Sequence, residues 1–192
     1  MEAADGSRER ILRAAAEEFG AKGYSGARTA GIARRAGVNQ QLISYYFGGK
    51  QGLLDELRRR WAASEATLVP ADASFTDTVA AYLDATLDRP DWARLVVWQA
   101  LGDDPTVTDD MAAERRSRLR DAVDRIRQRQ HSGEITGDLD AEFVLLLAYA
   151  VTFAPVALPH IVEGIFDVDP YSPEYRRRCR DQLAAIVRAN RP

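Results

Sequence analysis

The sequence predicts an all-α protein of about nine helices, with an N-terminal three-helix domain followed by a C-terminal helical bundle. Three observations predict this fold class. Apolar residues recur at helical spacing along most of the 192 residues. No stretch alternates apolar and polar residues as a half-buried strand does. Glycine, proline or clusters of polar residues separate the helical stretches, so we expect helices joined by turns.

The first helix is expected over about residues 7–22. Ile11, Ala15 and Phe19 follow one another at intervals of four residues, which places them on one face of a helix. Gly23 is expected to end this helix, because glycine readily adopts the left-handed conformation found at helix ends. The apolar face of this helix is predicted to be buried.

Two short helices joined by the sequence AGVN come next. Thr29 is expected to cap a helix that ends at Gly37. Asn39 is expected to cap a second helix, which ends at Phe47 before a pair of glycines. Two helices joined by a short turn that contains glycine form the helix-turn-helix pattern, and the sequence therefore predicts this motif.

The remaining helices are expected to form the body of the protein. A longer helix begins at Lys50 and has apolar residues that face inward: Leu53, Leu54, Leu57 and Trp61. Further helices are expected near residues 74–88, 91–101, 107–131, 140–160 and 173–189. Pro70, Pro90 and three polar loops separate them.

Composition limits the kind of protein. Hydrophobic residues make up 46% of the chain and charged residues 29%, which is typical of a folded globular protein. The single cysteine, Cys179, excludes an internal disulfide and a thiolate zinc site, and it favours a reducing compartment. The N-terminal sequence MEAADGSRER has no apolar core, so no signal peptide is expected. We predict a cytoplasmic protein without a metal or other cofactor.

One apolar stretch raises the question of a membrane span. Sixteen residues from Phe143 to Leu158 carry no charge. The stretch is shorter than the roughly 20 residues needed to cross a bilayer, and Pro155 interrupts it. A helix that is apolar on all sides is expected to be buried twice, here against its own core and against a partner subunit. No membrane contact is therefore predicted.

Charge is distributed unevenly along the chain. Residues 1–60 contain 11 Lys and Arg against 7 Asp and Glu, a balance of +4. The remainder contains 15 basic and 22 acidic residues, a balance of −7. Because a basic surface attracts a polyanion, this asymmetry favours nucleic-acid binding by the N-terminal part alone. Chance clustering is the alternative, since differences of this size are common.

The second helix of the helix-turn-helix has two unlike faces. On a helical wheel, Ile43, Tyr46 and Phe47 cluster on a side that is predicted to be buried, whereas Gln41 and Tyr45 point away from it. Gln40, Leu42 and Ser44 flank them on this outward face. The outward face has no acid, whereas an ordinary solvated face, the alternative interpretation, usually carries Glu and Lys. Glutamine can bond adenine, an aliphatic group can meet a thymine methyl, and basic or hydroxyl groups suit phosphates. The predicted DNA-binding residues are Arg28, Thr29, Asn39, Gln40, Gln41, Leu42, Ser44, Tyr45 and Lys50.

The N-terminal part of the chain, ILRAAAEEFGAKGYSGARTAGIARRAGVNQQLISYYFGGKQGLLDEL, resembles the DNA-binding domain of TetR-family transcriptional regulators. The resemblance covers about residues 8–57 without a gap. It is carried by Ile11, Ala14, Phe19, Gly23, Ile32, Ala33, Ala36, Gly37, Val38, Tyr46, Phe47, Lys50, Leu53 and Leu54. It implies a homodimer, in which residues 1–50 bind DNA and residues 51–192 form an all-α ligand-binding and dimerisation domain.

The resemblance also implies roles for single residues. The recognition helix would run from Gln40 to Phe47, and Lys50 would contact phosphate. Ser44 stands where the family usually has tyrosine, and Gln40–Gln41 stand where a Lys-Gly-like pair is frequent. With fewer aromatic and basic contacts, more of the discrimination is expected to fall on the glutamines, so the operator is expected to differ from those of relatives.

The C-terminal bundle is expected to hold a small-molecule effector and the dimer interface. Aromatic residues on its predicted helices are candidates for an apolar pocket, although each is also explained as simple core: Tyr82, Trp92, Trp98, Tyr149 and Phe153. Residues of its last two predicted helices are candidates for a four-helix interface across a two-fold axis: Ala150, Ala154, Ala157, Leu183, Ile186 and Val187.

Together these features predict a ligand-responsive DNA-binding transcriptional regulator, most simply a repressor that a small organic molecule releases from its double-stranded DNA operator. An enzyme is not expected, because the two histidines form neither a nucleophile–base arrangement nor a Glu-x-x-His metal motif. The alternative is a helix-turn-helix protein-interaction module without operator-specific DNA binding. Salt-dependent binding to duplex DNA distinguishes the two, because phosphate contacts release counterions.

Overall fold

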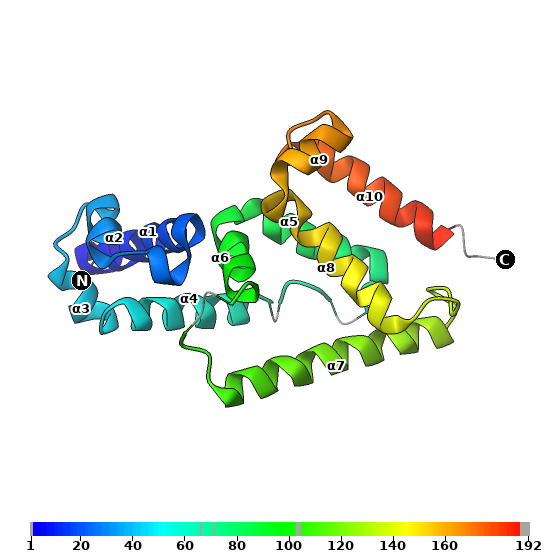
Figure 1. The fold of residues 1–192 in the computed structure, drawn as a ribbon, viewed down its shortest axis with the longest axis horizontal. Helices are drawn as coiled ribbons and strands as arrows, with labels where there is room; N and C mark the ends of the chain where they lie inside the picture. The colour runs from blue at the N-terminus through cyan, green and yellow to red at the C-terminus, as the bar shows by residue number, and fades with distance from the viewer. Residues whose placement is uncertain (1, 66, 71, 103–104, 189–192) are drawn as a thin grey trace. The chain divides into compact units, whose positions relative to one another are not determined.

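The described part of the chain folds into ten α-helices and contains no strand (Figure 1). The computed structural model describes residues 2–65, 67–70, 72–102 and 105–188; the side chains of 2–5 and 186–188 are not among those described. The all-α fold class is confirmed. The helices form two compact units, which are described separately: unit 1 comprises Met1–Thr67 and Arg89–Thr106, and unit 2 comprises Leu68–Asp88 and Val107–Pro192. The functional boundary expected after residue 50 stays a prediction.

Unit 1 contains the helix-turn-helix. Its helices are α1 (Glu2–Gly26), α2 (Thr29–Ala36), α3 (Gln41–Phe47), α4 (Lys50–Glu65) and α6 (Pro90–Ala100). Within it, α1 packs against α2, α4 and α6, and α3 packs against the start of α4. Helix α6 therefore belongs with the N-terminal helices, although it lies far from α3 in the sequence.

The glycines act as expected at the helix ends. Gly23 has φ 67° and ψ 176° and breaks the regular part of α1, so the last turn before Gly26 is displaced from the helix axis. Gly37 adopts the left-handed conformation with φ 64°, and its N–H is bonded to carbonyl groups of the last turn of α2. Gly48 ends α3 in the same conformation, with its N–H donating to the Ser44 carbonyl at 2.9 Å.

The two predicted N-caps differ in outcome. Thr29 was expected to cap α2, but it is the first residue of that helix, and its hydroxyl accepts a hydrogen bond from Gln40 instead. Asn39 lies one residue further from α3 than expected, because Gln40 occupies the N-cap position. Its side-chain Oδ1 nevertheless accepts the N–H of Gln41 at 2.9 Å and so satisfies one donor at the start of the helix.

A single apolar core holds unit 1 together. Its largest fully buried apolar side chains come from five helices: Ile11, Phe19, Ile32, Ile43, Leu53, Leu54 and Leu95. Trp92 and Leu95 of α6 complete this core. The crossing of α1 and α6 is close because position 20 is glycine: a Cβ there would lie 2.4 Å from the carbonyl oxygen of Asp91.

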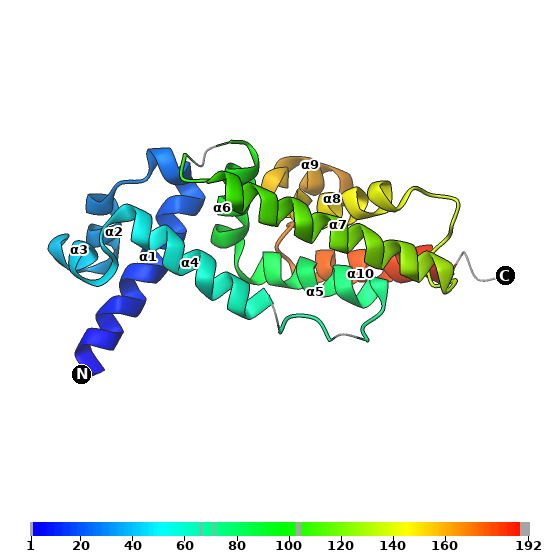
Figure 2. The same cartoon turned by 90° about the horizontal axis from the view of Figure 1, so that it is seen from below.

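Unit 2 contains the other five helices: α5 (Phe75–Asp88), α7 (Asp109–His131), α8 (Ala141–Ala157), α9 (Pro159–Phe166) and α10 (Pro173–Arg188). Helix α5 packs against both α8 and α10, and α7 packs against α8 (Figure 2). Two small apolar clusters result. One joins α5, α9 and α10 through Leu83, Leu87, Val162, Tyr175 and Cys179; the other joins α7 and α8 through Ile126, Ile135, Ala141 and Val144.

The chain bends sharply between α8 and α9, at an angle of 99°. The helix expected near residues 140–160 is observed as α8, which continues through Pro155 and ends at Ala157, whereas the separate helix α9 was not predicted. Leu158 leaves the helical conformation, and Pro159, which has no N–H to continue α8, occupies the first position of α9. No single helix of the described residues is long and apolar enough to span a membrane; α8 and α9 reach that length and composition only as a bent pair.

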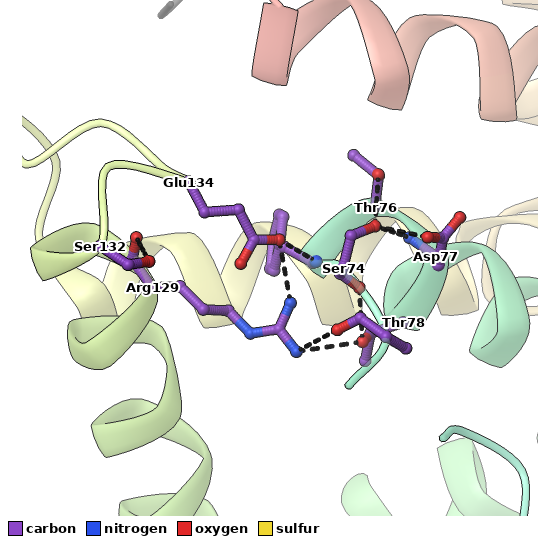
Figure 3. Close-up of polar contacts among 9 residues, drawn as sticks. Ser74, Thr76, Asp77, Thr78, Arg129, Ser132 and Glu134 are labelled. Atoms are coloured by element: carbon purple, nitrogen blue, oxygen red, sulfur yellow. Dashed lines mark hydrogen bonds and ion pairs between the residues drawn. The ribbon is translucent and has the colours of Figure 1, made fainter. Parts of the chain in front are cut away.

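A polar cluster fixes the start of α5 to the end of α7 (Figure 3). The guanidinium of Arg129 donates to the Ala73 carbonyl at 2.9 Å and pairs with Glu134 at 3.2 Å. The Glu134 carboxylate also accepts the backbone N–H of Phe75. This N–H is in the first turn of α5 and has no partner within the helix, so Glu134 caps α5 from the loop that follows α7.

Candidate nucleic-acid interface

The helix-turn-helix geometry places α3 at the surface of unit 1. The N–H of Val38 donates to the Ala33 carbonyl at 3.0 Å, which closes the turn after α2. Ile43 of α3 is fully buried in the core, whereas Gln41, Ser44 and Tyr45 are exposed. One side of α3 thus anchors the helix, and the opposite side is available to a partner.

The anchored side of α3 is broader than the helical wheel predicted. Tyr46 and Phe47 are half-buried against the core, as expected. Leu42 was assigned to the outward face, but it is also half-buried and packs against the same core. Tyr45 is 79% exposed, although it is a large aromatic side chain.

The two glutamines before and within α3 are in different situations. The amide Nε2 of Gln40 donates to the hydroxyl of Thr29 at 2.9 Å, which links α2 to the start of α3. The side chain of Gln41 is exposed and has no hydrogen-bond partner among the described residues. Of the two amides, Gln41 is therefore the one whose donor and acceptor both remain available to a base edge.

The sequence on both sides of α3 is basic and contains no acid. Residues 19–54 contain five Lys and Arg and no Asp or Glu. Lys50 begins α4, where the helix dipole adds positive potential, and its Nζ lies 4.3 Å from the centroid of the Tyr24 ring. Arg28 is exposed at the N-cap of α2 and donates to the Ser25 carbonyl at 3.4 Å. This surface is suited to a polyanion.

A buried carboxylate supports α2 from behind. Glu18 of α1 is 1% exposed and pairs with Lys22 at 2.6 Å and with Arg35 of α2 at 3.5 Å. The hydrogen bond from Lys22 outweighs the effect of burial, and the pKa of Glu18 lies below its ordinary value. Gly31 of α2 lies directly over this carboxylate: a Cβ there would be 2.6 Å from Oε1 of Glu18.

A second buried carboxylate connects α4 to α1. Glu56 is 6% exposed, accepts from Arg8 at 2.7 Å and from Arg60 at 3.0 Å, and pairs with Arg59. Burial alone would raise the pKa of Glu56, but the hydrogen bonds from Arg60 and Arg8 bring it below its ordinary value. Arg60 also forms two hydrogen bonds, of 2.7 and 2.8 Å, to Glu9.

Sequence reasoning missed both carboxylates, although a signal was present. Glu18 follows Ile11 and Ala15 on the apolar face of α1, and Glu56 follows Leu53 by three residues on α4. An acid at a position where the helical pattern requires an apolar residue predicts a buried ion pair. The partners could not be predicted, because Arg8 and Glu56 are 48 residues apart.

The five aromatic residues expected to line a pocket do not share one unit. Trp92 and Trp98 belong to α6 in unit 1, where Trp92 stacks on Trp61 and Trp98 donates its indole N–H to the Gly20 carbonyl. The other three lie in unit 2: Tyr82, Tyr149 and Phe153. Trp92 is a core residue, yet its buried indole N–H has no acceptor among the described residues.

The residues expected at a dimer interface also differ in exposure. Ala150 and Ala157 are exposed on α8, whereas Ala154 is half-buried against the cluster of α5, α9 and α10. Leu183 is buried within the protomer. The side chains of Ile186 and Val187 lie outside the described residues.

Comparison with known protein families identifies the chain. The model of bacterial regulatory proteins of the tetR family matches residues 11–57, and that of tetracyclin repressor-like C-terminal domains matches residues 75–189. The chain belongs to the TetR family. As a member of the TetR family it is a DNA-binding transcriptional regulator, and the resemblance found in its N-terminal sequence is confirmed.

Several known regulators are similar to this protein over most of its length. The HTH-type transcriptional repressor SCO4008 of Streptomyces coelicolor is 30% identical over 161 residues, which cover 82% of this chain and 82% of that protein. A solved structure of the transcriptional regulator SCO4942 of the same species has 27% identity and a TM-score of 0.70, covering 95% and 97% of the two chains. The ketosteroid regulator KstR2 of Mycobacterium tuberculosis has a TM-score of 0.71 at 22% identity, covering 94% and 92%, and shares the fold.

Proposed function

We propose that this protein is a homodimeric repressor that binds a specific DNA operator and is released from it by a small organic molecule. The observation that carries the proposal is the outward face of α3, which presents Gln41, Ser44 and Tyr45 without any acid and lies next to Lys50. The sign of regulation is inferred from the relative SCO4008, which is named a repressor.

The exposed groups divide into base-reading and phosphate-binding residues. Gln41 has an unengaged amide that can bond adenine through both its donor and its acceptor. Gln40 is held by Thr29 and would fix the start of α3 rather than read a base. Tyr45, Arg28 and Lys50 supply a phenol and two cations, which suit phosphate oxygens and would set the register on the duplex.

The proposed dimer forms through one face of α8. The opposite face of this helix buries Val144, Thr152 and Pro155 inside unit 2. The outward face exposes large apolar side chains: Phe143 at 48%, Leu146 at 62% and Leu147 at 45%. An apolar surface along a whole helix is typical of a contact with another protein, and a second copy of the chain would supply the two half-site contacts of an operator.

The proposed effector site lies in unit 2. Tyr149 and Phe153 stack nearly in parallel, with ring centroids 6.1 Å apart, and Tyr149 is 46% exposed. These rings and Tyr82 of α5 offer an apolar surface with phenol groups for an organic molecule. Trp92 and Trp98 belong to unit 1 and are not included in this proposed site.

Selection of binding sites from random duplex DNA tests the central proposal. We expect one enriched sequence with two-fold symmetry, and an affinity for it that falls steeply with salt because phosphate contacts release counterions. A protein-interaction module would enrich no sequence and would bind duplex DNA with little salt dependence. That result would overturn the proposal.

Sedimentation of two substitution variants tests the dimer. The wild type is expected at twice the protomer mass of 21.3 kDa. Leu146→Asp introduces a charge on the outward face of α8 and should give a monomer that binds the operator weakly. Leu101→Asp is the control, since Leu101 is 75% exposed in unit 1 and should leave the dimer intact. A wild-type monomer at micromolar concentration would contradict the proposal.

A further inference from the structure

Phe47, the last residue of α3, lies where three helices of unit 1 meet. A Cβ at Gly52 of α4 would lie 1.6 Å from the carbonyl oxygen of Phe47, so only glycine allows α4 to pass this close to the end of α3. On the other side, the guanidinium of Arg8 in α1 lies 5.3 Å from the centroid of the Phe47 ring. Helices α1 and α4 therefore both contact the residue that ends the recognition helix.

Arg8 is itself held by α4. Its Nη2 donates to Oε1 of Glu56 at 2.7 Å, and the Glu56 side chain is only 7% exposed. Glu56 follows Gly52 by four residues, so both lie on the same side of α4. That side of α4 contacts Phe47 directly through Gly52 and indirectly through Glu56 and Arg8. A movement of α4 relative to α3 would have to break one of these contacts.

A series of aromatic rings links Phe47 to the exposed face of α3. The rings of Phe47 and Tyr46 pack edge to face with centroids 6.2 Å apart, and those of Tyr46 and Tyr45 do so at 5.1 Å. Tyr45 is the side chain that is 79% exposed. The position of the Phe47 ring therefore influences where the Tyr45 phenol lies on the surface that faces DNA.

We propose that Arg8 is a positioning residue for operator recognition, which holds the end of α3 against α4 by bridging Glu56 and the Phe47 ring, without contacting DNA itself. The inference rests on the proposed function of α3 in reading DNA. Lysine at this position would keep the charge pair with Glu56 but would lose the planar guanidinium over the ring. Its effect is therefore expected to lie between those of arginine and alanine.

Titration of variants of the full-length protein against the selected operator and against a random duplex of the same length tests this role. Arg8→Ala should lower operator affinity by about 3- to 30-fold, the range expected when one partly buried cation–π interaction is removed. Arg13→Ala is the matched control, because Arg13 is an exposed cation of the same helix that forms no hydrogen bond or ion pair with another described residue. Relative to this control, Arg8→Ala should lower the affinity for random duplex much less than the affinity for the operator, and it should leave the salt dependence unchanged.

Two outcomes would overturn the proposal. Equal losses on both duplexes with a reduced salt slope would show that Arg8 binds phosphate directly. An Arg8→Ala protein that matches Arg13→Ala on the operator would show that Arg8 has no role in recognition. Phe47→Leu provides an independent check, since Arg8→Ala added to it should cause little further loss if both residues act through one contact.

Hydrogen exchange tests the same contact without DNA. The N–H of Gly48 donates to the Ser44 carbonyl at 2.9 Å and closes the last turn of α3. In Arg8→Ala this amide should exchange about 3- to 30-fold faster than in Arg13→Ala, because the end of α3 opens more often. Equal exchange rates would refute the positioning role. If the wild type selected no operator, the proposed function would fail, and this measurement would still decide whether Arg8 holds α3.

Discussion

The substitution Gly31→Ala is expected to destabilise the wild-type protein and to stabilise a protein that lacks the Glu18 carboxylate. In the wild type, the new Cβ would lie 2.6 Å from Oε1 of Glu18, so the carboxylate must move away from Lys22 and Arg35. A hydrogen bond to a charged group contributes about 1.5–3 kcal/mol. Lys22 and Arg35 are 49% and 46% exposed, so solvent screening limits the loss to about 1.5–2 kcal/mol.

Helix propensity acts in the opposite direction. Alanine in place of glycine within a helix stabilises by about 0.5–1 kcal/mol. The net effect of Gly31→Ala in the wild type is then a loss of about 0.5–1.5 kcal/mol in the free energy of unfolding. A Glu18→Ala protein has no carboxylate in the way of the new Cβ. In that background, Gly31→Ala should raise the free energy of unfolding by about 0.5–1 kcal/mol. The propensity term is the same in both backgrounds and cancels, so the coupling between the two positions is about 1.5–2 kcal/mol.

Urea unfolding followed by tryptophan fluorescence measures this cycle. The chain has three tryptophans, Trp61, Trp92 and Trp98, and all lie in unit 1 with Gly31 and Glu18, so the signal reports the unit that is changed. Gly6→Ala is the control: a Cβ there meets no atom closer than 3.8 Å, and it should be neutral or slightly stabilising in both backgrounds. If Gly31→Ala changes stability with the same sign in both backgrounds, the reasoning about the buried carboxylate is refuted.

Three further predictions concern pH, DNA contacts and packing. The folded-state pKa values of three carboxyl groups lie below the ordinary 4.5: those of Glu9, Glu18 and Glu56. The unfolded chain therefore takes up protons first as pH falls, and the stability that these carboxylates provide is lost below pH 4.5. An unchanged urea midpoint between pH 6 and pH 3 would contradict this. Gln41→Ala should weaken operator binding by about 1–3 kcal/mol per half-site, with much less effect on binding to random duplex. Lys50→Ala should weaken binding to both duplexes. It should also lower the slope of log affinity against log salt concentration by about one for each phosphate that is no longer neutralised. Equal losses on both duplexes for Gln41→Ala would show that another face of α3 meets the bases. Gly20→Ala should destabilise unit 1 by about 1–3 kcal/mol, because the new Cβ would meet the Asp91 backbone rather than a movable side chain; a urea midpoint at the wild-type value would count against the close α1–α6 crossing.

Local features of the sequence were enough to predict the helix-turn-helix. The left-handed conformation of Gly37 and Gly48 follows from their lack of a side chain, and Ile43 is buried because of its place in the helical pattern. These features depend on residues within one or two turns, which is the range over which hydrogen bonding and side-chain spacing act. The same reasoning assigned Leu42 to the outward face and was incomplete, since its half-burial depends on neighbouring helices that a wheel does not include.

The break at Leu158 shows where local reasoning fails even within one segment. Both Pro155 and Pro159 interrupt the pattern of a helix, and the sequence does not distinguish a proline that a helix accommodates from one that begins a new helix. Val162 of α9 packs in the cluster with Leu83 of α5, and this contact requires the chain to turn back after α8. The packing of the whole unit therefore selects the second proline as the break.

The order of residues along the chain is sufficient to predict that this protein is all-α, that it begins with a helix-turn-helix and that the outward face of the recognition helix lacks acids, because each of these properties is set by residues close together in the chain. Three other features emerge only when the helices are packed: α6 completes the core of unit 1, Glu18 lies under Gly31, and Arg8 bridges Glu56 and Phe47. Such contacts join residues far apart in the sequence, such as Gly20 and Trp98, which are 78 positions apart. They depend on which helix surfaces fit together, and no periodicity within a single helix specifies its partner.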